Sequence, residues 1–523
     1  MFVCDQLRAD HLGCYGNPIV RTPHIDGIGA RGTRFDNFFV ASPICMPNRA
    51  TLMTGRMPSL HGVRHNGIPL RLDATVFTEL LGAAGYRTAL IGKCHLQNML
   101  DKPAMVQADG GGGLQIAELS DARHDRIDGP EYEQESRRRW KDPAHDLGLP
   151  YYGFEHVELC DGHADETFGH YSRWLAARDP DAHKLCGPDN AIPDDRFVAP
   201  QAWRTRLPEE LYSTSYVAER SEAFLADRAK GSRESPFFLQ CSFPDPHHPF
   251  TPPGRFWEMY DPREIPAPET SGDPPENAPP HLRWLHAERA AGQTNLNTPR
   301  VIAVREREAR EAIALTYGMI SMIDGAVGRI LRALQDSGEA GNTVVIFMSD
   351  HGDLMGDHGL LFKHPLHYRG LIRVPFLWAE PGDRPGRPCP ALAGTLDVAR
   401  SILNRAGIAA YNGLQGASLL PLVFEDAGAS GHDSILIEED GQRIFGGFEK
   451  PVRCRSLVTE RWRMTVYDGV EWGEIYDLQN DPKEVNNLWP DPDFRRDKAE
   501  LMERLARKMI ACADKSPLPT GLA

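Results

Sequence analysis

The sequence predicts an α/β protein in which a large, mixed but mostly parallel sheet is sandwiched by helices, followed by a smaller α+β domain. Three observations favour this fold. The first 95 residues alternate apolar strand-like runs with helical ones, two later apolar runs (236–243 and 343–350) end in polar residues, and the segments after residue 411 are short and β-leaning before one last helix. We therefore expect a large domain over residues 1–405 and a smaller one over residues 411–523.

The N-terminal part alternates strands and helices, and its last helix and strand (76–92) have the order of the second half of a βαβ unit. The expected elements are, in order, a strand (1–4), a helix (22–32), a strand (33–40), an apolar helix opened by the turn at Cys45, a helix (76–85) and a buried strand (88–92). The fifth of these presents an apolar face and stops at Gly85, which is a common way to end a helix before a strand.

The middle of the chain changes character. From Gln97 to Arg206 the periodicity is weak and residues 110–113 are four glycines, so we expect a long insertion over the core that acts as a lid or substrate wall. Further elements then follow: a helix (211–229), a strand (236–243), a Pro-rich loop (252–299), a long helix with an apolar stripe from Ile320 to Leu334, strands (343–350 and 373–382), a helical run after the prolines near Cys389, and a final helix (494–513).

The bulk composition limits the class of protein. With 523 residues, 41% of them hydrophobic, the chain can bury a substantial core. A net charge of -15 argues against a broad basic face for nucleic acid, and an anionic substrate would need a local positive pocket. The ten cysteines form no CxxC pair, so most are expected to be small buried hydrophobes.

Hydropathy gives expectations about location. No run of about eighteen apolar residues is present, so we expect no membrane span, and no signal peptide is recognisable. These features favour a cytoplasmic protein. The first expected strand begins at Met1 itself, which leaves open that the natural start lies upstream.

Four of the expected strands end in side chains that can do chemistry. In chain order they deliver Asp5 and Gln6, then Lys93 and His95, then His247 and His248, and finally Asp350 and His351. Ligands of open parallel sheets bind at the carboxyl ends of the strands. A polar residue after one strand is common, because loops are polar. Four strands that each end in residues of metal-binding or anion-binding type predict a shared site.

Part of this set suits a metal. Asp5, Gln6, Asp350 and His351 offer oxygen and imidazole donors for one divalent cation, Ca²⁺ or Mn²⁺ in preference to Mg²⁺. Two carboxylates and a neutral amide leave the cation undercompensated, so an anionic ligand would complete the shell. For an isolated Asp-His-Gly the alternative is that Asp350 caps a turn and His351 is solvated.

Cys45 opens the apolar helix of the run CMPNRATLMTG. Pro47 fits the first turn, which places Cys45 at a helix N-terminus, where negative charge is stabilised. Arg49 lies one turn on and could hold an anion with two hydrogen bonds. A thiolate nucleophile is one option, but soft sulfur conflicts with hard oxygen donors. An oxygen nucleophile made from this cysteine would remove the conflict.

The C-x-P-x-R of this run, followed by ATLMTG, resembles the signature of the type I sulfatases in the alkaline phosphatase superfamily. The resemblance extends over nearly the whole chain, in the family's order, through TPHIDGIGARGTRFDNFF, TELLGAAGYRTALIGKCHL, PDPHHPF, SDHGDLMGDHGLLFK, IRVPF and EIYDLQNDPKEVNNL. It implies an alkaline-phosphatase-like fold and a sulfuric ester hydrolase, with a formylglycine-generating enzyme that oxidises Cys45 and a small-molecule sulfate ester as substrate. It also implies a homo-oligomer.

The resemblance implies a role for each site residue. The hydrated aldehyde made from Cys45 would attack sulfur and share the metal with Asp5, Gln6, Asp350 and His351. Arg49 and Lys93 would hold the hydrate and the ester, and His95 would accept a proton from the hydrate. His247 and Lys363 would stabilise the leaving oxygen and the transferred group. Asn66 and His358 are candidates for substrate binding, with a structural role open for His358, and His248 is expected to be structural.

Three departures from the family pattern bear on substrate. The family usually has serine where this chain has Asn48, and many members have a second aspartate where this chain has Gln6 and an asparagine where it has His351. The Asp-Gln and Asp-His pairs resemble the phosphonate monoester hydrolase branch, whereas Lys93-x-His95 resembles the arylsulfatases. A less negative site should tolerate phosphoryl anions better, so promiscuity is expected.

Three functions are therefore in competition. The first is a formylglycine sulfatase for aryl or alkyl sulfate monoesters, and the second is a phosphonate monoester or phosphodiester hydrolase with the same machinery. The third is a catalytically silent anion-binding protein in which Cys45 remains a thiol. Their discriminating features are the relative turnover of the two ester classes and the chemical state of Cys45.

Overall fold

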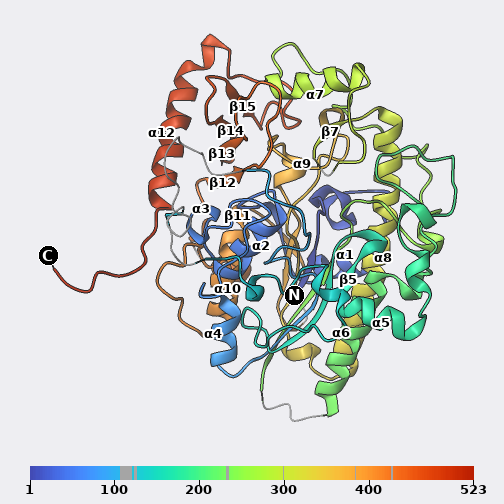
Figure 1. Cartoon of the computed structure of the whole chain (residues 1–523). Helices are drawn as coiled ribbons and strands as arrows, with labels where there is room; N and C mark the ends of the chain where they lie inside the picture. Colours follow the sequence, from blue (N-terminus) through green and yellow to red (C-terminus); the bar gives the residue numbers. More distant parts are fainter. Residues whose placement is uncertain are drawn as a thin grey trace, which may run out of the picture.

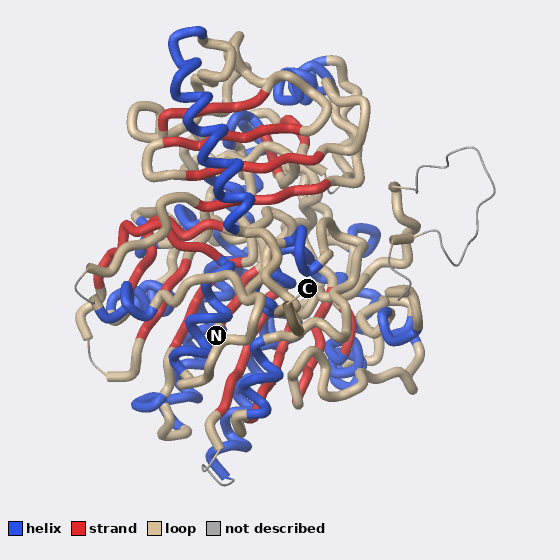
Figure 2. Tube along the Cα trace, turned by 90° about the vertical axis from the view of Figure 1, so that its left-hand side faces the viewer, coloured by secondary structure: helices blue, strands red, loops and turns tan. Residues whose placement is uncertain are grey.

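The computed structural model describes residues 1–106, 121–122, 126–230, 235–298, 300–382, 384–425 and 428–522. The glycine run expected at 110–113 lies outside the described residues. Figure 1 shows a large body with the C-terminal elements gathered at one end, and Figure 2 shows the small sheet of that end stacked on the edge of the large one.

A nine-stranded sheet forms the centre of the described chain, in the order β11-β2-β10-β8-β1-β6-β3-β4-β5. Its strands are β1 (Phe2–Cys4), β2 (Thr33–Phe39), β3 (Arg87–Gly92), β4 (His156–Asp161), β5 (Phe168–Gly169), β6 (Phe237–Phe243), β8 (Val345–Ser349), β10 (Phe376–Ala379) and β11 (Arg387–Gly394). The five strands from β8 to β4 run parallel, so their carboxyl ends share one edge. β10 and β5 are antiparallel to their neighbours, which makes the sheet mixed, as predicted.

Helices cover both faces of the sheet, and each face has its own apolar cluster. One face carries α2 (Cys45–Thr54), α4 (Phe77–Ala83) and α10 (Val398–Arg405), and the other carries α1 (Pro23–Ala30), α5 (His170–Arg178), α6 (Ser213–Lys230) and α8 (Glu306–Asp336). The predicted stripe of α8 is buried from Ile320 to Leu334 against the second face. Short helices α3 (Pro58–His61), α9 (Arg369–Ile372) and α11 (Leu420–Phe424) and the ribbon of β7 (Ile302–Ala303) with β9 (Leu360–Leu361) fill the connections.

The C-terminal part is a separate α+β layer. Four antiparallel strands, β12 (Ile435–Asp440), β13 (Arg453–Val458), β14 (Trp462–Tyr467) and β15 (Gly473–Asp477), are covered by α12 (Arg495–Ala511). Leu501 and Leu505 of α12 pack on Leu436, Leu457 and Met464 of the sheet. This arrangement confirms the predicted fold class.

Three segments differ from the sequence-based expectation. The Pro-rich loop over 252–299 contains the helix α7 (Pro280–Ala290), because Pro280 occupies a helix N-terminus where proline is tolerated. The run after Cys389 begins as β11, whose prolines lie in an edge strand. The insertion over 97–206 supplies β4 and β5, so part of it belongs to the sheet rather than covering it.

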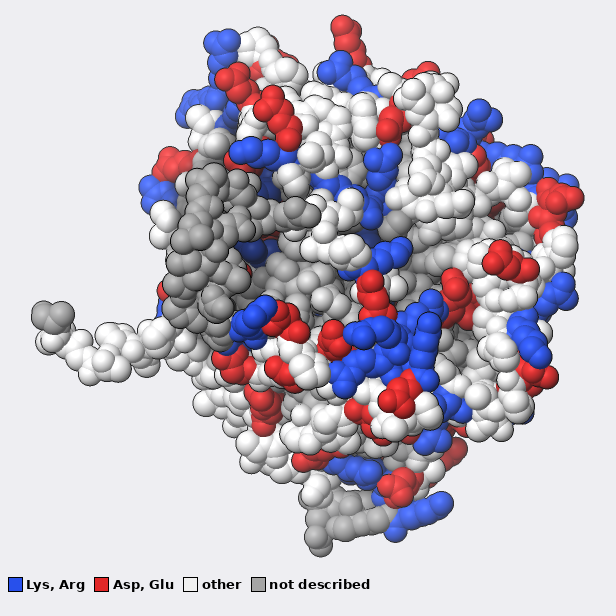
Figure 3. Space-filling view, viewed as in Figure 1, with Lys and Arg blue, Asp and Glu red and all other residues white. Residues whose placement is uncertain are grey.

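Charges are mixed on the surface. On the face that Figure 3 shows, basic and acidic side chains lie side by side around a central hollow. Within the described chain, no helix combines the length and the hydropathy needed to cross a membrane.

Candidate active site

The carboxyl edge of the parallel strands gathers the predicted polar residues. Asp5 follows β1, Lys93 follows β3 and Asp350 follows β8, and the peptide nitrogen of Asp350 donates to the carbonyl of Cys4 at 3.1 Å. All three side chains are buried. Parallel strands of one sheet therefore bring charges that are far apart in the sequence to the same edge.

Cys45 is the first residue of α2 and is 1% exposed. Its Sγ atom lies 2.9 Å from Nζ of Lys363, 3.1 Å from Nε2 of His351 and 3.8 Å from Oδ1 of Asp5. Burial and Asp5 raise the pKa of the Cys45 thiol, but Lys363 and His351 outweigh them and lower it. The site favours negative charge at this position.

Arg49 joins the helix to the strand ends. Its Nε donates to Oδ2 of Asp350 at 2.7 Å, and its Nη1 donates to the Ser242 hydroxyl and to the carbonyl of Lys93. The side chain is 2% exposed, and its Nη2 has no hydrogen-bond partner within the described residues. A buried guanidinium nitrogen without a partner is costly, so it offers a donor to a bound anion.

The donors around Asp350 fit a cation. Ligand atoms of Asp5, Cys45, Asp350 and His351 all lie within 4.8 Å of one another. Burial and Lys363 lower the pKa of His351, but the opposing effect of Asp350 and Cys45 is larger. The pKa of His351 is therefore raised from 6.5 to about 10. The negative charge that holds this proton is charge that a divalent cation would neutralise.

Gln6 completes this group. Its peptide nitrogen donates to Oδ1 of Asp350, and its side-chain nitrogen contacts Asp353 and Nδ1 of His248. The remaining atom, Oε1, is buried and unpaired in the described part of the molecule. His248 therefore orients Gln6, and Gln6 Oε1 is available to a hard cation.

Two lysines lie near the cysteine: Lys363 contacts it directly, and Lys93 pairs with Asp5, which lies 3.8 Å from the Sγ atom. Lys93 pairs with Asp5 and lies 2.7 Å from Nε2 of His163, while Lys363 lies 3.1 Å from Nε2 of His247. Burial lowers the pKa of Lys363, but Cys45 and Asp5 raise it above its ordinary value. A buried pocket for an anion is thus positive locally although the chain is acidic overall.

His95 stands beside this group in an unusual backbone conformation, with φ of 58°. Burial, and then Lys93 and Arg49, lower its pKa well below the ordinary value, so the ring is neutral. Its Nδ1 has no partner among the residues described. A neutral ring nitrogen without a partner can accept a proton.

The two predicted substrate residues have different places. Asn66 lies on the cavity wall, and its Oδ1 accepts from the Met46 peptide nitrogen at 3.0 Å. His358 stacks on Tyr368 with ring centroids 3.7 Å apart, and its backbone bonds to Thr270 and His286. The structure thus places His358 in packing away from the cavity lining and does not support substrate binding by it, because its ring is held against Tyr368.

A cavity of about 600 Å³ leads to Cys45. Its walls come from the insertion (residues 98–100, 102–105 and Gln201) and, unexpectedly, from the C-terminal layer, including residues 439–443. Gln442 links them, because its side chain contacts the carbonyl of Asn66 and the peptide nitrogen of Met105. The pairing of a C-terminal turn with the insertion has no local sequence signal.

His163 is a site residue that the sequence did not predict. It follows β4 and lies against Lys93, but the weak periodicity of the insertion hid this strand. The run HVELCDGH has the alternating apolar pattern of a strand that ends in a polar group, which is the signal that could have revealed it.

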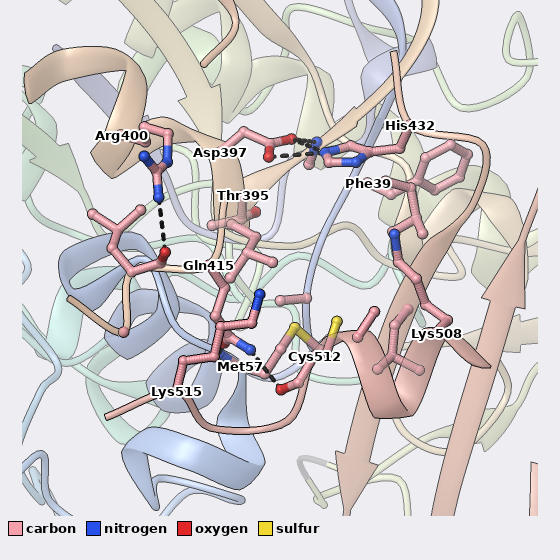
Figure 4. A pocket seen from close by; sticks show the side chains of 18 of the residues that line it. Phe39, Met57, Thr395, Asp397, Arg400, Gln415, His432, Lys508, Cys512 and Lys515 are labelled. Atoms are coloured by element: carbon pink, nitrogen blue, oxygen red, sulfur yellow. Dashed lines mark hydrogen bonds and ion pairs between the residues drawn. The ribbon is translucent and has the colours of Figure 1, made fainter. Parts of the chain in front are cut away.

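A second cavity, of about 460 Å³, lies between the sheet edge and α12 and is separate from the site around Cys45. Figure 4 shows His432 turned toward Asp397, and Arg400 bonded to a backbone oxygen. The Asp397 carboxylate also accepts from the peptide nitrogens of Gly394 and Ala417, so its oxygens are engaged in holding the loops.

Comparison with known proteins finds relatives over nearly the whole chain. The family pattern described as sulfatase matches residues 1–408, and the pattern described as N-sulphoglucosamine sulphohydrolase, C-terminal, matches residues 356–511. An arylsulfatase of Clostridium perfringens is 28% identical over 505 residues, covering 95% of this chain and 90% of the relative. A multifunctional alkaline phosphatase superfamily protein of Trinickia caryophylli is 25% identical over 546 residues, covering 98% and 94%.

The fold also has close structural neighbours. The crystal structure of the phosphonate monoester hydrolase of Agrobacterium radiobacter superposes with a TM-score of 0.75 at 24% identity, covering 100% of this chain and 97% of the other. At that identity the match speaks for the fold.

Proposed function

The chain belongs to the sulfatase family, and from that premise we propose that it hydrolyses aryl or alkyl sulfate monoesters with a formylglycine made from Cys45. One observation carries the proposal. The Sγ atom of Cys45 lies within 3.1 Å of both Lys363 and His351, on the helix that also carries Arg49. Hydrated formylglycine at that position is an oxygen nucleophile, which suits the carboxylates better than a thiolate does.

Asp5, Gln6, Asp350, His351 and the modified residue 45 would hold one divalent cation, which when bound would acidify the nucleophilic hydroxyl and offset charge on the sulfuryl oxygens. Ca²⁺ and Mn²⁺ fit the donors better than Mg²⁺, as the sequence analysis expects.

The cationic side chains stabilise the transferred group. The unpaired Nη2 of Arg49 and the ammonium groups of Lys93 and Lys363 supply donors where negative charge develops on the sulfuryl oxygens. His247 contacts Lys363 and would stabilise the alcohol oxygen as it leaves. Its pKa is lowered by burial and by His163, so it would act by hydrogen bonding through a neutral ring.

Product release would use the second hydroxyl of the hydrate. After the first has taken the sulfuryl group, the second loses its proton, sulfate departs and the aldehyde re-forms. The neutral His95 with its free Nδ1 is the proposed acceptor of that proton.

Maturation follows from burial. Cys45 and the rest of α2 are buried, so the formylglycine-generating enzyme would act before this helix packs into the fold.

A second candidate is hydrolysis of phosphonate monoesters or phosphodiesters by the same groups. Gln6 favours it, because an amide in place of a carboxylate leaves the site less negative toward phosphoryl anions.

Steady-state kinetics on a nitrophenyl sulfate and a phenylphosphonate ester tests the proposal. We expect a higher kcat/KM for the sulfate and measurable turnover of the phosphonate. A reversed ratio would favour the second candidate, and no turnover of either by metal-loaded enzyme would reject both.

A further inference from the structure

His163 brings a fifth strand end to the active-site edge. It lies two residues after β4, which pairs in parallel with β3, the strand that delivers Lys93. Its side chain is 26% exposed and lines the cavity, whereas the side chains of Lys93 and Asp5 are fully buried. His163 is therefore a cavity-lining side chain in direct contact with this ion pair.

The contacts of His163 are specific. Its Nε2 lies 2.7 Å from Nζ of Lys93 and 3.7 Å from Oδ2 of Asp5. Its ring stacks on that of His247, with centroids 3.7 Å apart and planes at 16°. Stacking on His247 thus fixes the orientation of the His163 ring, and Nε2 of the ring faces Lys93.

The direction of the hydrogen bond is decided by chemistry. An ammonium group has three donors and no acceptor, so Nε2 of His163 must present its lone pair to Lys93. A second donor of Lys93 is taken by Asp5. With two of its three N–H bonds held by fixed acceptors, the ammonium can no longer rotate, and the direction of its third N–H is set.

We propose that His163 is a positioning residue for ester hydrolysis, which by accepting a hydrogen bond from Lys93 turns the remaining N–H of that ammonium toward the transferred sulfuryl or phosphoryl group. The inference rests on the proposed function, since it assigns Lys93 a substrate oxygen. His163 acts through Lys93, so the charge it places is used where negative charge develops.

The ring and the acceptor can be separated by substitution. His163→Phe keeps a ring to stack on His247 but removes the acceptor, whereas His163→Gln keeps an acceptor oxygen and removes the ring. We expect His163→Phe to lower kcat/KM by roughly 10- to 100-fold and His163→Gln by less than about 5-fold. His156→Phe, at the other end of β4, is the matched control and should retain wild-type turnover.

A double-mutant cycle distinguishes positioning from a structural effect. In the Lys93→Met background, His163→Phe should change kcat/KM by no more than about twofold, because the group it orients is gone. Losses that multiply across the two sites would overturn the inference, as would wild-type kinetics for His163→Phe or equal losses for the Phe and Gln variants.

The dependence of the rate on the leaving group shows whether His163 acts through Lys93 or through His247. If His163 acts through Lys93 on the transferred group, the loss in His163→Phe is the same for esters of acidic and of weakly acidic phenols. A loss that grows with the pKa of the phenol would place His163 at the leaving oxygen and contradict the proposal.

A binding measurement that needs no turnover tests the role of His163 separately from the proposed function. In the Cys45→Ala protein, calorimetric titration with inorganic sulfate should show His163→Phe weakening binding by about tenfold and His163→Gln by much less. If the wild type hydrolyses neither ester, the proposed function fails, yet equal sulfate affinities for the Phe and Gln variants would still be required to reject the role of His163.

Discussion

The Nζ atom of Lys363 lies 2.9 Å from the Sγ atom of Cys45, although 318 positions separate the two residues in the chain. Lys363 reaches the cysteine from the loop after β9, and both side chains are buried. The pKa of the thiol is lowered and that of the lysine raised, because each stabilises the charged form of the other against the cost of burial. An ammonium group is thus in place at residue 45 before any substrate binds, which is the preorganisation that catalysis of a charged transfer needs.

Removing that ammonium should impair turnover. We expect Lys363→Met to lower kcat/KM for a nitrophenyl sulfate by roughly 10²- to 10³-fold, which is the range found when one donor to a developing anion is lost. Steady-state kinetics measures the effect, and Lys515→Met, on the exposed C-terminal segment, is the control. Near wild-type kinetics for Lys363→Met would remove this residue from the mechanism.

Chelation should abolish activity. Ligand atoms of Asp5, Asp350 and His351 converge on residue 45 within 4.8 Å of one another, which is the arrangement that a divalent cation binds. Dialysis against EDTA should lower kcat to background, and Mn²⁺ or Ca²⁺ should restore it, with the bound metal counted by mass spectrometry. Asp350→Asn should raise the metal concentration needed for half-maximal activity by about tenfold or more. Full turnover in metal-free buffer would contradict the assignment.

The geometry of Arg49 cannot be supplied by lysine. The guanidinium uses Nε on Asp350 and Nη1 on Ser242 and leaves Nη2 free, so it spans the gap between helix and sheet. We expect Arg49→Lys to lower kcat/KM by roughly 100-fold. Arg56→Lys, two residues beyond the end of the same helix, where the arginine pairs with Asp514, should stay within about twofold. Similar losses in both variants would point to damage of α2 rather than to a lost contact with substrate.

The polar residues at the strand ends could be predicted from the sequence, but the residues that the fold brings beside them could not. Asp5, Lys93 and Asp350 each follow an apolar run, which is a local signal, and the parallel sheet brings them together. The order of the strands is not local, so the position of His163 beside Lys93 could not be foreseen from a segment of weak periodicity. The same holds for Gln442, which closes the cavity from a domain more than three hundred residues away from Asn66.

The hydrogen bonds of Asn48 explain why this chain has asparagine where the family usually has serine. Its Oδ1 accepts from the peptide nitrogen of Ala41 at 3.0 Å, and its Nδ2 donates to the carbonyl of Asp350 and to Thr395. An amide has both donors and acceptor for this arrangement, whereas a serine hydroxyl has one donor and a shorter reach. The sequence marks Asn48 only as unusual, while the structure shows that it ties α2 to Asp350 at the end of β8.

Stability should fall in mild acid because of buried neutral histidines. Burial, and then Arg56, lower the pKa of His61 from 6.5 to about 3. The unfolded chain therefore binds a proton that the folded one does not, and the free energy of unfolding decreases as the pH falls below 6.5, by up to about 1.4 kcal/mol per pH unit for this group. Urea unfolding at a series of pH values from 7 to about 4.5 measures the slope.

The contribution of His61 can be isolated. His61→Asn keeps an acceptor for the Val63 peptide nitrogen, which bonds to Nδ1 of the histidine, but does not titrate. It should flatten the pH dependence by up to one proton, while His183→Asn, at an exposed position, should leave it unchanged. An identical slope in His61→Asn and wild type would show that this histidine is not buried as described.

The chemical state of Cys45 tests the account most directly. The peptide that contains residue 45, obtained from enzyme with measured turnover and weighed by mass spectrometry, should be lighter than the unmodified peptide by about 18 Da, the difference between a thiol and an aldehyde side chain. An unshifted peptide throughout a fully active sample would mean that the nucleophile is not a formylglycine made from Cys45.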